Sequence, residues 1–484
     1  MPIRIYNTQT GKKEEFKTVQ PGKVGMYVCG VTVYDLCHIG HARSAVVFDV
    51  IYRYLKYSGL ETTYVRNFTD VDDKIIKRAN EQKISSTEVS EKYIAAFYED
   101  MDAIGVLRPD VEPKATGHIE EMVAHIVKLI EMGHAYEVNG DVYFSVDSFR
   151  PYGRLSGRNL DEMMVGARVD VDERKKNPLD FALWKSAKPG EPFWPSPWGD
   201  GRPGWHIECS VMSQKYLGET LDIHGGGKDL VFPHHENEVA QAEAVTNKPF
   251  ANYWMHNGFV NIDKEKMSKS LGNFFTIRDV LKAVNPEVLR FFLLSHHYRS
   301  PVDYSDQSLK DARAGLEKLY RFIEKLEGRL PAAPKAATAQ SDAEKALAEA
   351  LEAFRVDFCA SMDDDFNAAG AIGHLHKFAN AAGGLIEKSS PDFVADVYGE
   401  LKKITGVLGL FTLPAKEYFA HQQSEAKSAL EISPEEIDTL VAERAEAKKA
   451  KNFARADEIR KLLLDKNVIL EDGPQGTSWK VKAD

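Results

Sequence analysis

The sequence predicts an α/β protein that begins with a parallel sheet and continues into helices. Residues 25–29 (GMYVC) are apolar and β-prone, and apolar residues then recur about every 3.6 positions over residues 38–55, as in a helix. Residues 61–68 (ETTYVRNF) are β-prone again. This succession predicts a βαβ unit with parallel strands and a right-handed crossover. Because such sheets bind ligands beyond the carboxyl ends of their strands, Cys29 and Thr69 are candidate site residues.

Length, composition and charge favour a multidomain protein of the cytoplasm. The 484 residues correspond to about three domains, and 43% apolar with 28% charged residues is typical of globular proteins. The net charge of −11 disfavours a uniformly basic nucleic-acid binder, although residues 444–461 hold seven basic and only three acidic side chains. Four cysteines disfavour a disulfide scaffold, and no apolar run approaches the roughly 20 residues of a membrane span.

The rest of the chain alternates helical periodicity with turn-rich stretches. In chain order we expect helices over 80–185 with a hairpin at 136–146, an irregular stretch at 188–204, a helix at 307–328, a Pro/Ala-rich linker at 330–340, helices over 343–410, a second linker at 412–434, and two helices with a terminal hairpin over 435–484.

A pair of histidines stands at the predicted turn from the first strand into its helix. His38 and His41 flank Ile39 and Gly40. A helix N-terminus presents free amide groups and a partial positive charge, so it attracts phosphate. Both imidazoles can donate to the same anion, and Gly40 lets a flat ring lie against the backbone. Taken alone, the tetrapeptide is also compatible with two surface histidines at a helix start.

A second candidate for phosphate binding lies far downstream, in the run KMSKS at residues 266–270. Lys266 and Lys269, with Ser268 between them, are typical of a mobile loop that neutralises the charge of a leaving pyrophosphate. An exposed basic loop is the alternative. The glycine run at 225–227 is not part of a Walker A motif, because Asp229 stands where that motif has Ser or Thr.

Cys29, Cys209, His234 and Glu238 form a candidate metal site. His234 and Glu238 are four residues apart, which places them on one face of a helix. Two thiols, an imidazole and a carboxylate are ligands that zinc accepts. The pattern differs from the His-Glu-x-x-His zinc motif, because Val239 stands in place of the second histidine. Scattered ligands leave a second interpretation open, namely two buried thiols and a surface His/Glu pair.

The two phosphate-binding motifs together resemble the paired signature of class I aminoacyl-tRNA synthetases. The flanking sequence narrows the resemblance to the cysteinyl-tRNA synthetases, and it extends nearly from end to end. The blocks that carry it are YVCG at 27–30, NFTDVDDKI at 67–75, GWHIECS at 204–210, HGGG at 224–227, FPHHENE at 232–238 and EDGPQG at 471–476.

The resemblance implies a Rossmann-like catalytic domain with a parallel sheet and an inserted domain, an α-helical bundle, and a small mixed α/β C-terminal domain. The expected boundaries are 1–115 and 205–305 for the catalytic domain, 116–204 for the insertion, 306–412 for a tRNA-binding helical bundle, 413–433 for a linker and 434–484 for an anticodon-binding domain.

The resemblance also implies a two-step reaction. L-Cysteine and ATP give cysteinyl-adenylate and pyrophosphate, and the cysteinyl group then passes to the 3′-terminal adenosine of tRNA(Cys). It implies one Zn²⁺ per chain, on Cys29, Cys209, His234 and Glu238, and Mg²⁺ with ATP. We expect a monomer in the cytoplasm.

Zinc suits the choice of cysteine over serine. A shaped apolar pocket supplies only about 1–3 kcal/mol, whereas an accuracy of roughly 10⁴ needs about 5.5 kcal/mol. A soft thiolate binds zinc better than a hydroxyl does. We therefore expect the site to take the substrate sulfur as a further ligand, without a separate editing domain.

The resemblance assigns roles to individual residues. His38, Gly40 and His41 would hold ATP, and Lys266, Ser268 and Lys269 would act on its phosphates, with His38, His41, Lys266 and Lys269 as the catalytic residues. The adenosine would lie against Gly225, Gly226, Gly227 and Asp229, and cysteine would lie among Thr69, Trp205 and His224.

Two other functions remain to be distinguished. A tRNA-independent ligase that joins activated cysteine to an amino sugar would use the same catalytic domain, but it would not need the last 50 or so residues. A catalytically silent zinc-bound binding protein is the other alternative, and the intact phosphate motifs disfavour it.

Overall fold

The computed structural model describes residues 2–158, 174–262, 265–266, 275–333, 340–428, 432–473 and 476–481. The chain separates into two compact units. The first comprises residues 1–319 with 329–410, and the second comprises residues 320–328 with 411–484. None of the helices in the described ranges combines the length and the apolar character that a membrane crossing needs.

A four-stranded parallel sheet forms the centre of the first unit. Its order is β10 (Ala251–Asn257), β9 (Leu221–Gly227), β3 (Lys23–Thr32) and β4 (Glu61–Thr69), and all neighbours pair in parallel. Helix α1 (Ile39–Tyr57) connects β3 to β4, as the sequence predicted. Most of α1 is buried, because its apolar positions face the sheet on one side and other helices on the other.

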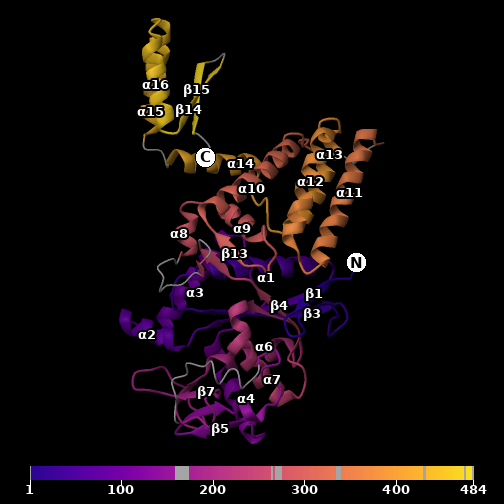
Figure 1. Cartoon of the computed structure of the whole chain (residues 1–484), viewed down its shortest axis with the longest axis vertical. Coiled ribbons are helices and arrows are strands. Elements are labelled where there is room, and N and C mark those ends of the chain that lie inside the picture. Colours follow the sequence, from indigo (N-terminus) through magenta and orange to yellow (C-terminus); the bar gives the residue numbers. More distant parts are fainter. Residues whose placement is uncertain are drawn as a thin grey trace. The chain divides into compact units, whose positions relative to one another are not determined.

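A second sheet belongs to the region between β4 and β9. It has the antiparallel order β5 (Ala135–Val138), β6 (Asp141–Phe144), β7 (Phe181–Ser186) and β8 (Gly201–Pro203), and its first two strands confirm the hairpin predicted at 136–146. This sheet shares one apolar core with the neighbouring helices, which Figure 1 shows beside it: α4 (Ile119–Glu131), α6 (Trp205–Leu217) and α7 (Glu236–Thr246).

Three long helices lie side by side in the first unit (Figure 1, orange). They are α11 (Asp342–Asp363), α12 (Ala368–Ile386) and α13 (Pro391–Gly406). The remaining elements of this unit are β1 (Arg4–Asn7), β2 (Lys12–Glu15), α2 (Asp73–Gln82), α3 (Ser86–Ala103), β11 (Val260–Ile262), β12 (Glu265–Lys266), α8 (Ile277–Leu281), α9 (Pro286–Leu294), β13 (Val302–Tyr304) and most of α10 (Asp306–Glu327).

A buried ion pair joins these helices to the region of the parallel sheet. Asp49 of α1 and Arg290 of α9 are each 1% exposed and contact one another. The Nε atom of Arg290 donates to the carbonyl oxygen of Leu408, just beyond α13, at 2.7 Å. Gly409 follows with φ +64°, and a Cβ there would lie 2.5 Å from the guanidinium group. The backbone at Gly409, just after α13, therefore lies closer to the guanidinium group of Arg290 than any residue with a side chain could.

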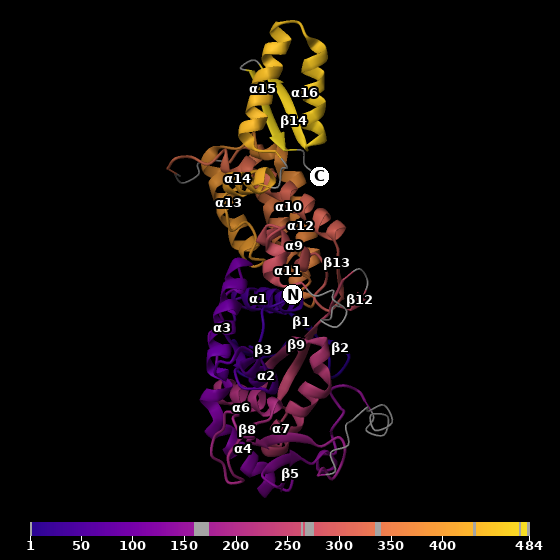
Figure 2. The same cartoon turned by 90° about the vertical axis from the view of Figure 1, so that its left-hand side faces the viewer.

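The second unit has its own small core. Helices α15 (Pro434–Lys449) and α16 (Phe453–Asp465) pack with the hairpin of β14 (Val468–Gly473) and β15 (Gly476–Val481), as the yellow ribbons of Figure 2 show. The apolar residues of this cluster are Ile432, Ile437, Ile459, Leu463, Val468 and Leu470, with Leu440, Val441 and Trp479 against them. The two helices and the hairpin predicted over 435–484 are thus confirmed.

The segment predicted as a linker, 413–433, contains a helix that the sequence did not indicate: residues Ala415–Ser428 form α14. Tyr418 of this helix is fully buried and stacks on Tyr320, with 3.7 Å between the ring centroids. The sequence of α14 has few large apolar residues, and its burial depends on this aromatic contact, which the local pattern does not reveal.

Candidate active site

A small hollow lies where β3 and β4 approach their carboxyl ends. The predicted metal ligands and two of the predicted cysteine-binding residues line it together, although they come from five separate elements. The lining residues are Cys29, Gly30, Asn67, Thr69, Trp205, His206, Cys209, Leu230, His234 and Glu238.

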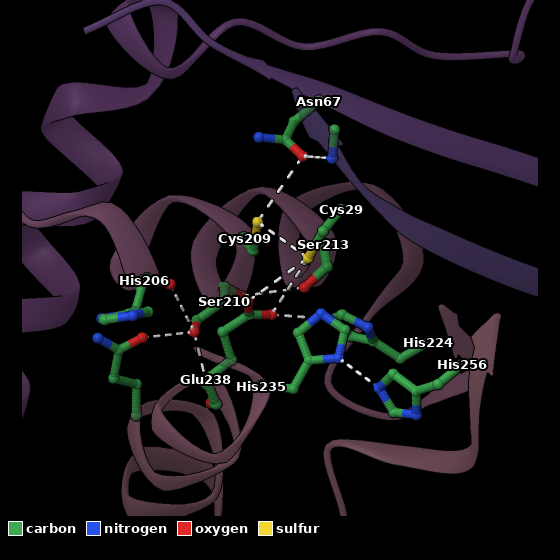
Figure 3. A network of polar contacts seen from close by, with 12 residues as sticks. Cys29, Asn67, His206, Cys209, Ser210, Ser213, His224, His235, Glu238 and His256 are labelled. Carbon is green, nitrogen blue, oxygen red and sulfur yellow. Dashed lines mark hydrogen bonds and ion pairs between the residues drawn. The ribbon is translucent and has the colours of Figure 1, made fainter. Parts of the chain in front are cut away.

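Two thiols and a carboxylate converge on one side of this hollow (Figure 3). The Sγ atoms of Cys29 and Cys209 are 3.4 Å apart, and Cys29 Sγ is 3.5 Å from Oε1 of Glu238. Burial, followed by contact with Cys209 and Glu238, raises the pKa of the Cys29 thiol well above its usual value. Groups that would all be anionic when deprotonated thus crowd together, and a cation among them would relieve this. With histidine nitrogens nearby, the donor set fits zinc.

His234, the predicted histidine ligand, does not lie on the same helix as Glu238, contrary to our expectation. His234 does not belong to α7, which begins at Glu236, but to the short π-helix Val231–His235 before it. Its Nδ1 lies 2.9 Å from Nε2 of His206. Burial lowers the pKa of His234 to about 4, so its imidazole is neutral and able to act as a ligand near neutral pH.

Two histidines outside the predicted ligand set lie close to Cys29 and Glu238. Ligand atoms of Cys29, His224, His235 and Glu238 all lie within 4.8 Å of one another. This group shares Cys29 and Glu238 with the predicted set and has His224 and His235 in place of Cys209 and His234. Among the described residues, Cys29 and Glu238 thus belong to both the predicted and the observed group, and more than one histidine is close enough to be considered as the remaining ligand.

His224 lies beside the candidate metal ligands, outside the lining of the hollow. Its Nε2 is 2.9 Å from Oε2 of Glu238, and its ring stacks on Trp254 at 4.4 Å. Of the three residues predicted to bind cysteine, Thr69 and Trp205 line the hollow, whereas His224 contacts the carboxylate of Glu238.

Asn67 and Glu208 are polar residues of this site that the sequence analysis missed. Asn67 Oδ1 accepts from the amide of Gly30 at 2.8 Å, and the two strands are so close here that a Cβ at Gly30 would lie 1.6 Å from the Asn67 carbonyl oxygen. Glu208 is fully buried and accepts from Thr69 Oγ1 at 2.6 Å. Burial, opposed by that hydrogen bond, raises the pKa of Glu208 well above its usual value. Asn67 lies in the block NFTD and Glu208 in the block HIEC. Membership of these blocks is the one feature of the sequence that could have marked them as site residues.

The paired histidines lie at the start of α1, as predicted, and they also cap it. His38 is the N-cap residue, and its Nδ1 accepts from the amide of Gly40 at 3.0 Å. His41 Nδ1 accepts from the amide of His38 at 3.2 Å, and the two rings stack with 3.8 Å between centroids. Because each Nδ1 accepts, a neutral ring carries its proton on Nε2. The amides of Ile39, Gly40 and His41 already donate to the Phe275 carbonyl, the His38 ring and the His38 carbonyl, so this end of α1 would attract an anion through its partial positive charge and not through unbonded amides.

Part of the second phosphate motif lies outside the described residues. Ser268 and Lys269 belong to that part, and of Lys266 only the backbone, in β12, is described. The chain is described again from Phe275, five residues beyond the run KMSKS. There it lies against the start of α1, because the amide of Ile39 donates to the carbonyl oxygen of Phe275 at 3.4 Å and that of Ile277 donates to the carbonyl oxygen of Cys37 at 2.9 Å.

The glycines predicted to meet adenosine are mostly packed against protein. A Cβ at Gly225 would lie 2.3 Å from the ring of Phe48 in α1, and one at Gly226 would lie 2.9 Å from His235. Gly225 and Gly226 are buried, Gly227 is half-buried and Asp229 is exposed. The last two positions are accessible to a nucleotide.

The comparisons with known proteins decide the family. The model of the tRNA synthetases class I (C) catalytic domain matches residues 15–314, and that of the DALR domain matches residues 357–412. Over the full length of both chains, the sequence is 57% identical to the cysteine–tRNA ligase of Geobacter sp. (strain M21) and 55% identical to that of Geobacter sulfurreducens (strain ATCC 51573 / DSM 12127 / PCA). The chain belongs to the cysteine–tRNA ligase family. The predicted family and enzyme class are thereby confirmed.

Solved structures confirm the fold of a class I synthetase. The methionyl-tRNA synthetase of Mycobacterium tuberculosis in complex with methionyl-adenylate is similar, with a TM-score of 0.58 at 14% identity over 83% of this chain and 92% of that one. The LeuRS of Agrobacterium radiobacter K84 agnB2, in its ternary complex, gives a TM-score of 0.57 at 11% identity over 83% and 87% of the two chains. The enzyme thus combines the Rossmann-like parallel sheet with a helical C-terminal part, as expected.

Proposed function

We propose that the hollow beside Cys29 and Cys209 is the place where this enzyme binds L-cysteine for activation by ATP, and that zinc held there selects the substrate sulfur. The enzyme then transfers the cysteinyl group to the 3′-terminal adenosine of tRNA(Cys). The observation that carries the proposal is the convergence of the Cys29 and Cys209 thiols with the Glu238 carboxylate at the wall of a hollow that also contains Thr69.

Cys29, Cys209 and Glu238 would hold the metal together with a histidine, for which His234 is our candidate. Zinc in this position supplies a soft cation that prefers a cysteine thiolate to a serine hydroxyl. His224 would keep the carboxylate of Glu238 oriented through the 2.9 Å contact between them. Outer-shell contacts of this kind affect metal affinity by about 10–100-fold.

The chain itself contributes charge and position to the first step. The carboxylate of cysteine attacks the α-phosphorus of ATP, so no protein nucleophile is needed. His38 and His41 would donate from Nε2 to the phosphates at the N-terminus of α1, and Lys266 and Lys269 would neutralise the leaving pyrophosphate. Mg²⁺ accompanies ATP. Gly227 and Asp229, the accessible part of the glycine run, would contact the adenosine.

The second unit would bind the anticodon region of tRNA. Phe453, at the start of α16, is 63% exposed, and the preceding turn and helix carry Lys448, Lys449 and Lys451. An exposed ring beside cations is suited to stacking on an unpaired base. The relatives match over residues 434–484 as well, and this disfavours the tRNA-independent amino-sugar ligase. The domain boundaries, the monomeric state and the cytoplasmic location stay predictions.

Removal of one thiol tests the metal role. Cys209→Ser should lower the zinc content from one per chain, and cysteine-dependent ATP–pyrophosphate exchange should fall by at least about 100-fold. Elemental analysis and the exchange assay measure the two effects. Cys359→Ser is the matched control, because Cys359 is half-buried in α11, away from the hollow, and should keep both properties. Wild-type exchange with unchanged rejection of serine in Cys209→Ser would show that zinc does not select the substrate.

A further inference from the structure

A hydrogen bond at the wall of the hollow determines how Thr69 can meet a ligand. Thr69 Oγ1 donates to Glu208 Oε2 at 2.6 Å, from the last residue of β4 to the first turn of α6. Thr69 lines the hollow, and Glu208 lies behind it, 0% exposed. The carboxyl group retains an oxygen that can accept from Thr69 whether or not its other oxygen carries a proton.

The carboxyl group of Glu208 is not fully satisfied by this bond. Its Oε1 is buried and has no hydrogen-bond partner among the described residues. A buried polar atom without a partner costs free energy and therefore calls for an explanation. The neighbouring charges do not provide one, because Asp70, Asp72 and Glu238 are all acidic. The carboxylate of Asp70 is already bound by the amide and hydroxyl of Thr116, at 2.9 and 2.6 Å.

The hydrogen bond leaves Thr69 with acceptor capacity alone. A hydroxyl has one proton and two lone pairs, so once the proton is donated to Glu208, only lone pairs remain for the hollow. An ammonium group is a cation that only donates, and it would find both a hydroxyl acceptor and an acidic environment here.

We propose that Glu208 is a positioning residue that turns Thr69 into the acceptor for the α-ammonium group of cysteine. This inference rests on the proposed function, since it takes the hollow as the cysteine site. The sulfur is then chosen at the thiol cluster, and the ammonium group is recognised separately, at the end of β4.

Substrate analogues distinguish this role from a structural tie between β4 and α6. 3-Mercaptopropionate lacks the α-ammonium group of cysteine, and cysteamine lacks the α-carboxylate. Their dissociation constants, and that of cysteine, are to be measured by calorimetry on the zinc-loaded full-length enzyme. A structural defect would weaken all three ligands together, whereas loss of the ammonium acceptor would weaken cysteine and cysteamine but spare 3-mercaptopropionate.

Wild-type enzyme should bind cysteine more tightly than 3-mercaptopropionate by roughly tenfold to hundredfold, the range for a hydrogen bond to a charged group. Thr69→Val and Glu208→Leu should bring that ratio close to one, and the double variant should lose no more than either single one. Glu208→Gln should retain most of the ratio, because its amide oxygen can accept from Thr69. The ratio of cysteine to cysteamine should be the same in all of these enzymes.

A ratio within twofold of wild type in Thr69→Val, with normal zinc content, would overturn the inference. This variant decides the matter even if Glu208→Leu fails to fold, since valine replaces threonine at nearly constant volume. Failure of the proposed function looks different, because cysteine would then not bind the zinc-loaded wild-type enzyme at all.

Discussion

At the scale of single residues, the enzyme keeps a group of histidines away from water. His256 of β10 contacts Thr8 Oγ1 through Nδ1 at 2.8 Å and His235 through Nε2 at 2.9 Å. Burial, with smaller contributions from the charges of His224 and Lys228, lowers the pKa of His256 to about 3. As the pH falls, such a residue binds a proton at a much higher pH in the unfolded chain than in the folded one, so it links stability to pH.

His256 should make the enzyme sensitive to mild acid. Its ordinary pKa is 6.5, and the lowered value in the folded state means that its contribution to stability is complete above pH 6.5 and is lost as the pH falls towards 3. The free energy of unfolding should decrease by up to about 1.4 kcal/mol per pH unit from this one group. Urea unfolding at pH 7.5, 6.0 and 5.0 should show a shallower dependence in His256→Gln. His421→Gln, at an exposed position, is the control and should retain the wild-type slope.

The sequence indicated that Cys29 and Cys209 belong to one site, but it did not pair Thr69 with Glu208 or His224 with Glu238. Cys29 and Thr69 could be placed at strand ends because the βαβ pattern is local. The contacts of Cys29 with Cys209 and of Thr69 with Glu208 join residues more than 130 positions apart, and they depend on how α6 packs on the sheet. No periodicity within either segment reports that packing. For the same reason the sequence could not tell that His224 contacts Glu238.

At the scale of elements, the approach of α1 to β9 depends on a missing side chain. A Cβ atom on Gly225 would lie only 2.3 Å from the ring of Phe48 in α1, which is too close for two carbon atoms. Gly225 is one of the residues expected to contact adenosine. In the structure it is buried, and the absence of a side chain lets a phenyl ring lie against the strand. A run of three glycines has the same appearance in either case, so the pattern alone does not distinguish the two roles.

Gly225→Ala should destabilise the first unit by about 1–3 kcal/mol, because the added methyl group forces Phe48 to move within a packed core. Gly373→Ala is the matched control. Gly373 lies in α12, is exposed, and has open space within 4 Å of the position that a Cβ would take, so its replacement should stabilise by about 0.4–1 kcal/mol. Thermal unfolding of the two variants should shift in opposite directions, and equal shifts would contradict this account of β9.

At the scale of the whole molecule, the C-terminal cluster around Ile437 and Leu463 is self-contained. Its helices and hairpin were readable from sequence because their caps and periodicity are local: Ser433 caps α15 with Glu436, and Asn452 caps α16. Helix α14 could not be read in this way, since Tyr418 and Tyr320 are distant in sequence.

Removal of residues 432–484 should separate the two steps of the reaction. Adenylate formation, measured by ATP–pyrophosphate exchange, should stay within about twofold of wild type, because every residue of the hollow lies in the first unit. Charging of tRNA(Cys) should fall by at least about tenfold, the loss of one good base contact. Equal charging by the truncated and the complete enzyme would remove the anticodon role from this region.

The ion pair between Asp49 and Arg290 limits how the first unit can be divided. A recombinant fragment that stops near residue 314, where the match to the catalytic family ends, would contain both charges but not the Leu408 carbonyl that Arg290 also binds. It would also expose the apolar faces of α1 and α9 to water. Such a fragment should aggregate on expression, so minimal versions of this catalyst must retain the chain as far as residue 410.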